Sequence, residues 1–177
     1  MATANKNLSD YDKSLYVDAV NCKIGIAVSD WNYNITQNLL RGTLDTLLDC
    51  GVLKNNILVK HVPGSFELVY GAKKLQSKDL DAIIVIGCLI RGETKHFDYV
   101  CKGVTDGIRD LNILNDVPVI FCVLTDNTIQ QSIDRSGGNY GNKGVEAAVS
   151  ALKMINFNKD LYFFLNLFPH ALSTIKF

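Results

Sequence analysis

Short apolar runs of strand length alternate along this chain with longer segments of helical periodicity. A strand that is apolar at nearly every position has to be buried on both faces, as happens in a parallel sheet covered by helices. Four such runs are rich in β-branched residues: 23–28, 57–62, 82–87 and 117–124. The alternation therefore predicts an α/β protein, a three-layer α/β/α sandwich around a four-stranded parallel sheet.

The segments between the runs carry apolar residues at helical spacing. One helix should follow the first run and end near Gly51, with these residues on one side: Ile35, Leu39, Leu40, Leu44, Leu47 and Leu48. Further helices are expected over 66–75, 97–111, 128–135 and 145–155, with a glycine-rich elbow at Gly137, Gly138 and Gly141. A chain of 177 residues has the size of one domain, so we expect a single flavodoxin-like sandwich.

Charge and composition narrow the possible partners. Eighteen lysines and arginines balance eighteen aspartates and glutamates, so no basic field attracts nucleic acid or an anionic membrane. No stretch approaches the roughly 18 apolar residues of a membrane span, and the polar start lacks a secretory signal. Five scattered cysteines without a C-x-x-C pair are typical of reduced core thiols. We expect a cytoplasmic protein that binds small molecules, with neither nucleic acid nor membrane as a partner.

Unusual residues follow each of the four predicted strands. In open α/β sheets, ligands bind outside the carboxyl ends of the strands, where the loops of this chain should meet. The loops are 29–32, 63–67, 88–96 and 125–127. Their convergence predicts a site at this edge of the sheet.

The segment from Gly92 to His96 is the strongest candidate for binding an anion and transferring protons. It forms a glycine turn with Thr94 and places the histidine at a helix start, where backbone N–H groups make an anion site. The positive helix end also favours a neutral imidazole that accepts a proton. A helix-capping loop with a surface histidine is the alternative interpretation.

Three other residues fit such a site but also have ordinary structural explanations. Arg135, at the end of a short helix, could bind the same phosphate, or could be a solvated surface arginine. Trp31 could stack on a heteroaromatic ring or simply pack. Glu67, near a helix start, could bind a substrate hydroxyl or be stabilised there by the helix dipole.

Several classes of site are excluded by what the sequence lacks. No G-x-G-x-x-G follows the first strand, and the segment 141–144 lacks the spacing of a phosphate-binding P-loop. The histidines His61, His96 and His170 show no spacing typical of a metal site. We expect neither a metal nor an organic cofactor.

The motifs together resemble the lumazine synthase family. The resemblance runs in the same order from about residue 20 to about residue 156, through Trp31-Asn32, 62–67, 92–100, 117–125, and Arg135 with 142–144. Enzymes of this family condense 5-amino-6-(D-ribitylamino)uracil with 3,4-dihydroxy-2-butanone 4-phosphate, releasing phosphate and water, in the penultimate step of riboflavin biosynthesis. The resemblance implies that this chain is a transferase of that kind and needs no cofactor.

The resemblance also assigns roles to individual residues. His96 resembles the residue that transfers protons, and Arg135 the arginine that binds phosphate. The phosphate loop corresponds to Gly92, Glu93 and Thr94. The pyrimidine ring and ribityl chain would be held by Trp31, Ser65, Phe66, Glu67, Leu89 and Ile90, together with Phe121 and Lys143 from the adjacent subunit.

Both ends of the chain extend beyond the resemblance. Residues 1–20 form an N-terminal extension, 21–157 the lumazine synthase-like domain, and 158–177 a C-terminal tail without an assigned role. The tail is apolar around 161–165 but too short to span a membrane. Many relatives carry phenylalanine in place of Trp31, which preserves stacking.

Members of this family form pentamers, and many form hollow shells of sixty subunits. The short elbow over 136–142 resembles the shell-forming members, so we expect a homo-oligomer of pentamers closed into a shell. Riboflavin synthase is a candidate partner. Two alternatives of the same fold are a non-catalytic shell-forming protein and a phosphate-ester-binding protein.

Overall fold

Four parallel strands form the sheet in this computed structural model, which describes residues 7 and 9–167. The strands are β1 (Ile24–Ser29), β2 (Ile57–Val62), β3 (Ala82–Ile90) and β4 (Val119–Asp126). Their order across the sheet is β2-β1-β3-β4, and every neighbouring pair is parallel. The predicted four-stranded parallel sheet is confirmed.

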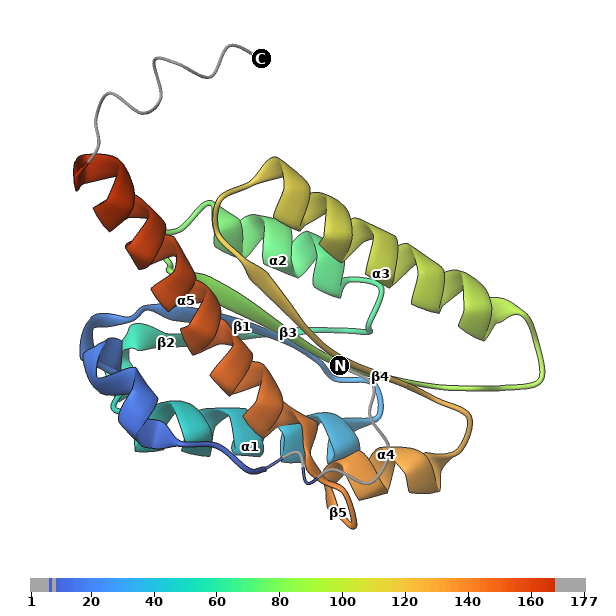
Figure 1. The fold of residues 1–177 in the computed structure, drawn as a ribbon. Helices are drawn as coiled ribbons and strands as arrows, with labels where there is room; N and C mark the ends of the chain where they lie inside the picture. The colour runs from blue at the N-terminus through green and yellow to red at the C-terminus, as the bar shows by residue number, and fades with distance from the viewer. Residues whose placement is uncertain (1–6, 8, 168–177) are drawn as a thin grey trace.

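Helices cover both faces of this sheet (Figure 1). One face carries α1 (Tyr33–Asp49) and α5 (Lys143–Leu167), and the other carries α2 (Leu68–Gln76) and α3 (His96–Leu114). The short helix α4 (Ile129–Arg135) follows the last strand. The predicted three-layer α/β/α sandwich is therefore confirmed, including the stop of α1 before Gly51, which has a positive φ of 95°.

The two central strands supply both halves of the core. Alternate side chains of β3 point to opposite faces, so Ile84 and Ile86 pack with α1 and α5 while Ile83 and Val85 pack with α2 and α3. All six residues of β1 are buried. This two-sided burial explains why the sequence of these strands is a continuous apolar run.

The outer strands differ from the prediction that all four are buried on both faces. In β2 no residue is fully buried, and Lys60 and His61 are exposed. On the opposite edge, the side chain of Phe121 in β4 is 38% exposed. Each of these strands has a neighbour on one side only, so solvent reaches its other edge.

Element boundaries shift most where the site lies. Strand β3 continues past the predicted end at Gly87, because Leu89 and Ile90 pair with Thr125 and Asp126 of β4. Helix α2 begins at Leu68, so Glu67 lies in the turn before it. The glycine-rich elbow is a small hairpin of β5 (Ser136–Gly138) and β6 (Gly141–Asn142).

The N-terminal segment is attached to the body of the protein. The 3-10 helix η1 (Lys13–Asn21) buries Tyr16 and Ala19 in the core, and a second short helix, η2 (Lys54–Asn56), precedes β2. The Tyr11 hydroxyl donates a hydrogen bond of 2.9 Å to Asp49. Burial, reinforced by this carboxylate, raises the pKa of Tyr11 to about 12.

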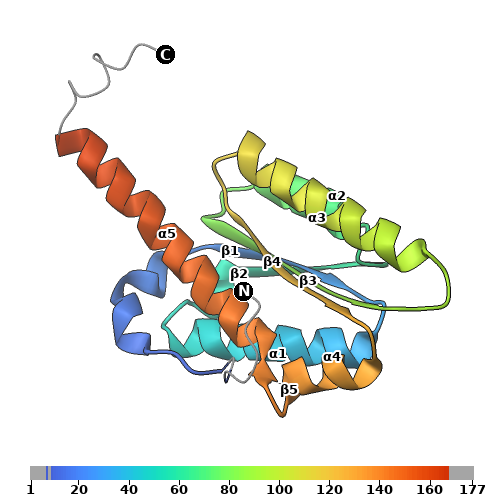
Figure 2. The same ribbon diagram turned by 45° about the vertical axis from the view of Figure 1, so that its right-hand side comes forward.

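Helix α5 is much longer than predicted. It continues past the expected end at Ile155 to Leu167 without a break, and its last part projects beyond the sandwich (Figure 2). The exposed apolar side chains of this part are Phe157, Leu161, Tyr162, Phe163 and Phe164. Over the residues that are described, no helix is long and apolar enough to cross a membrane. The rest of the predicted tail, 168–177 with His170, lies outside the described residues.

The start of α5 packs against α1 at a position that only glycine can occupy. A Cβ atom added to Gly144 would lie 2.0 Å from the Leu39 carbonyl oxygen and 2.8 Å from the Thr43 hydroxyl. We expect Gly144→Ala to lower the free energy of unfolding by about 2–4 kcal/mol, the cost of overpacking against a fixed backbone. Urea denaturation measures it. Gly92→Ala is the control, because a Cβ there meets no atom within 4 Å, and equal losses in the two variants would contradict the packing argument.

Candidate active site

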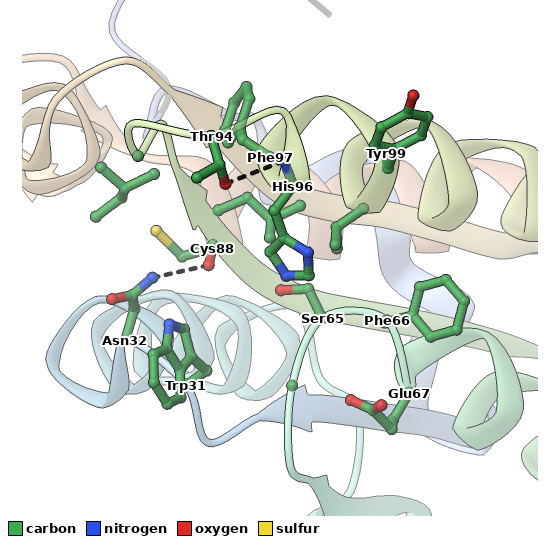
Figure 3. Close-up of a pocket in the computed structure, with 15 residues that line it drawn as sticks. Trp31, Asn32, Ser65, Phe66, Glu67, Cys88, Thr94, His96, Phe97 and Tyr99 are labelled. Atoms are coloured by element: carbon green, nitrogen blue, oxygen red, sulfur yellow. Dashed lines mark hydrogen bonds between the residues drawn. The ribbon is translucent and has the colours of Figure 1, made fainter.

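A cavity of about 860 Å³ lies at the carboxyl edge of the sheet (Figure 3). The ends of β1, β2 and β3 and the first turn of α3 surround it. Its lining consists of Trp31, Asn32, Gly64, Ser65, Phe66, Glu67, Cys88, Leu89, Ile90, Gly92, Thr94, His96, Phe97, Tyr99 and Val100. Three of the four loops named from the sequence therefore meet here.

The structure divides the predicted site residues into two groups. Those that line the cavity are Trp31, Ser65, Phe66, Glu67, Leu89, Ile90, Gly92, Thr94 and His96. Glu93 belongs to the same loop but does not line the cavity. Three residues lie on other elements and do not line it either: Phe121 on β4, Arg135 at the end of α4, and Lys143 at the start of α5.

Trp31 forms one wall of the cavity and is 70% exposed. Its backbone N–H donates to the Pro63 carbonyl over 3.1 Å. The next residue, Asn32, has a left-handed backbone with φ 58° and donates from its side chain to the Cys88 carbonyl over 2.9 Å. Asn32 had no predicted role of its own, although asparagine tolerates this left-handed conformation better than most residues.

The side chains of His96 and Ser65, which both line the cavity, point toward one another (Figure 3). His96 is the first residue of α3, and its backbone N–H donates to the Thr94 hydroxyl over 3.4 Å. Ser65 is only 4% exposed, and its hydroxyl has no hydrogen-bond partner among the described residues. Buried hydroxyls are normally hydrogen-bonded, so this one is suited to bind a polar atom of a ligand.

Arg91 holds the loop that precedes α3. Its guanidinium donates to Asp98 over 2.9 and 3.4 Å and to the Asn127 side chain over 3.0 Å. It also stacks 4.4 Å from the centre of the Phe97 ring. Because the guanidinium already has these partners, Arg91 fixes the glycine loop rather than facing the cavity. The sequence places Asp98 seven residues later, a separation that gave no sign of this contact.

Helix α4 positions Arg135 away from the cavity of its own chain. A capping box between Thr128 and Gln131 starts the helix, and the Ser132 hydroxyl donates to Asp126 over 2.8 Å. The Arg135 guanidinium donates to the Gln131 carbonyl over 3.0 Å and lies 5.3 Å from the Tyr140 ring centre. Lys143 forms an ion pair with Glu146. Neither cation lines the cavity of its own chain.

Across the part of the chain that is described, no group of three histidine, cysteine or acidic side chains is placed to hold a metal ion. His61 instead pairs with Asp30. None of the five cysteines, all of which lie within the described residues, forms a disulfide, and four are buried. The predicted core position is confirmed for all but Cys101, which is partly exposed.

The chain is a parallel α/β sandwich with one cavity that is lined by a histidine, an aromatic side chain and a glycine-containing loop at a helix start. These features are typical of an enzyme that acts on small molecules. The chain matches the family model of 6,7-dimethyl-8-ribityllumazine synthase over residues 21–159. The chain therefore belongs to this family, whose members are transferases of riboflavin biosynthesis.

Curated relatives support the same assignment. A 6,7-dimethyl-8-ribityllumazine synthase of Flavobacterium johnsoniae is 62% identical over 155 residues, which cover 87% of this chain and 82% of the relative. One of Parabacteroides distasonis is 59% identical over 159 residues, covering 89% of this chain and 99% of the relative. The resemblance found in the motifs is confirmed.

Two buried cysteine thiols, one of which lines the cavity, should be unreactive in the folded protein. Burial raises the pKa of Cys122 to about 12 and also raises the pKa of Cys88. Since the thiolate is the reactive form, iodoacetamide at pH near 8.5 should leave both residues unmodified while labelling all five thiols in guanidinium chloride. Site-resolved mass spectrometry measures this. Rapid labelling of Cys122 in the folded protein would contradict the burial argument.

Proposed function

We propose that this chain condenses 5-amino-6-(D-ribitylamino)uracil with 3,4-dihydroxy-2-butanone 4-phosphate to give 6,7-dimethyl-8-ribityllumazine, phosphate and water. The observation that carries the proposal is the arrangement of one cavity, which is lined by Trp31, Ser65 and His96. The buried Ser65 hydroxyl has no hydrogen-bond partner in the part of the chain that the structure describes. Membership of the lumazine synthase family supports the choice of substrates.

The cavity offers a place for each part of the two substrates. The pyrimidine ring stacks on Trp31, and the walls formed by Ser65, Phe66, Glu67, Leu89 and Ile90 hold the ring and the ribityl chain. The phosphate binds at the loop of Gly92, Glu93 and Thr94, where the backbone N–H groups of the α3 start favour an anion. These positions bring the reacting amine and ketone next to His96.

The reaction needs alignment and proton transfer. The amine attacks the ketone, water leaves to give an imine, phosphate is eliminated, and ring closure releases a second water. Holding two reactants in place can supply roughly 7–11 kcal/mol of the barrier. His96 adds proton transfer at the amine and at the leaving groups, a contribution of about 10²–10⁴-fold.

The complete site requires a second subunit in this proposal. Phe121, Arg135 and Lys143 do not line the cavity of their own chain, which supports their supply to a neighbour's cavity around a pentamer. The hairpin over 136–142 is short, which favours closure of pentamers into a sixty-subunit shell. We further propose a cytoplasmic location, supported by the lack of a disulfide among the five cysteines, all of them within the described residues, with riboflavin synthase as a partner.

Mixing the two substrates with the protein and following the fluorescence of the lumazine product tests the activity. His96→Ala should lower kcat about 10²-fold, because the aligned reactants remain but the proton-transfer group is lost. KM for either substrate should change little. Lys102→Ala is the control, since Lys102 lies on the same helix and pairs only with Asp106 among the contacts described.

Two outcomes would contradict parts of this proposal. Turnover of His96→Ala within twofold of the wild type would mean that water or substrate carries the protons. Absence of product with the wild-type protein would favour a non-catalytic shell-forming protein or a phosphate-ester-binding protein instead.

The shared site can be tested with mixed rings. In a heterologous ring, a site is intact when its His96 comes from an Arg135→Ala chain and its Arg135 from a His96→Ala chain. Random mixing at equal ratio should make about a quarter of the sites intact. The activity of the co-expressed mixture should therefore exceed the mean of the two separate variants. If native mass spectrometry detects mixed rings but the activity does not rise above that mean, the shared site is ruled out.

A further inference from the structure

An exposed histidine and an exposed aspartate meet just outside the cavity. His61 lies near the end of β2, and Asp30 is the first residue after β1. The His61 Nδ1 atom is 2.7 Å from an Asp30 carboxylate oxygen, and the two side chains are 46% and 53% exposed. Neither residue lines the cavity, and neither belongs to the roles that the family resemblance assigns.

This pair sits next to the aromatic wall. The Asp30 backbone N–H donates to the Val62 carbonyl over 2.9 Å, and the Trp31 N–H donates to the Pro63 carbonyl over 3.1 Å. Together with the side-chain contact to His61, these bonds continue the pairing of β1 with β2 past the last register pair, Ser29 with Val62.

Trp31 is thus held by its own backbone N–H and through its two neighbours. On one side, Asp30 is tied to β2, and on the other side Asn32 is tied to the Cys88 carbonyl in β3. The indole itself is 70% exposed, so packing does little to fix it. Its place at the cavity depends on how firmly both neighbours are held.

The contribution of the pair to stability is small. Exposed ion pairs add little to the free energy of folding because water screens the charges. A neutral imidazole N–H also donates to a carboxylate, so the contact does not require a charged histidine. What the contact does supply is a further link between the ends of β1 and β2, and the loops that follow both strands line the cavity.

We propose that Asp30 and His61 form a clamp that positions Trp31 for the pyrimidine substrate. They are positioning residues, because they act through Trp31 and touch no reacting atom. The inference rests on the proposed role of Trp31 as the stacking wall.

Trp31 is the only tryptophan of the chain, so its fluorescence reports the clamp directly. Trp31 fluorescence is excited selectively in the absence of substrate. His61→Ala should increase the amplitude of the fast fluorescence depolarisation of Trp31, because side chains that are not held reorient in picoseconds to nanoseconds. It should also increase the rate at which acrylamide quenches this fluorescence. His61→Asn should restore most of the wild-type signal, since its amide N–H lies near the place of Nδ1. Lys60→Ala, on the same exposed strand, is the control and should leave the signal unchanged.

Steady-state kinetics give the second measurement. His61→Ala should raise KM for the pyrimidine about three- to tenfold, the range for the net contribution of one ordinary hydrogen bond, while kcat and KM for the butanone phosphate stay within twofold. Asp30→Ala should have the same effect, and the double variant should be no worse than either single one.

Specific results would overturn the clamp. An unchanged Trp31 signal in His61→Ala, or His61→Asn behaving like His61→Ala, would show that the contact does not hold the indole. Equal increases of KM for both substrates would indicate a general structural role. If Trp31→Ala leaves KM for the pyrimidine unchanged while the fluorescence results hold, then the stacking role of Trp31 is wrong and the clamp is correct.

Discussion

The parallel pairing of β1 with β3 is the interaction on which the rest of this molecule depends. Both strands are buried on both faces, so each needs a helix layer above and below, and a parallel connection needs a crossover that supplies one. The same geometry sends the carboxyl ends of all four strands to one edge. A cavity between Trp31, Ser65 and His96 follows from this pairing, because each residue stands just beyond the end of a strand or at the start of the helix after it.

The sequence predicted best the parts that are governed by periodicity. The central runs around Ile26 and Ile84 had to be buried strands, and the fold class followed from them. Burial at the edges was not predictable from apolar content, because a run such as 57–62 looks the same whether it has one neighbour or two. Strand order decides that, and strand order is a long-range property. The extension of β3 to Ile90 was not predictable either, because it depends on pairing with Thr125 and Asp126 of β4.

The site was predicted in its residue types but not in the contacts that hold it. Trp31, Ser65 and His96 were identified from motifs and do line one cavity. The residues that fix them are less evident in a sequence. Asn32 reaches Cys88 across 56 positions, Arg91 reaches Asn127 across 36, and His61 reaches Asp30 across 31. Contacts at such separations carry no local pattern, so only the folded chain brings these residues together.

The length of α5 has a practical consequence for how this protein can be labelled. Ile155 is the last buried residue of the helix that is described, and Leu167 follows twelve positions later. At about 1.5 Å per residue, the helix carries its end about 18 Å from the point at which it leaves the core. A dye or spin label attached near that end would therefore lie well outside the sandwich. Distances between such labels on different subunits would report where the ends of α5 lie in an assembly.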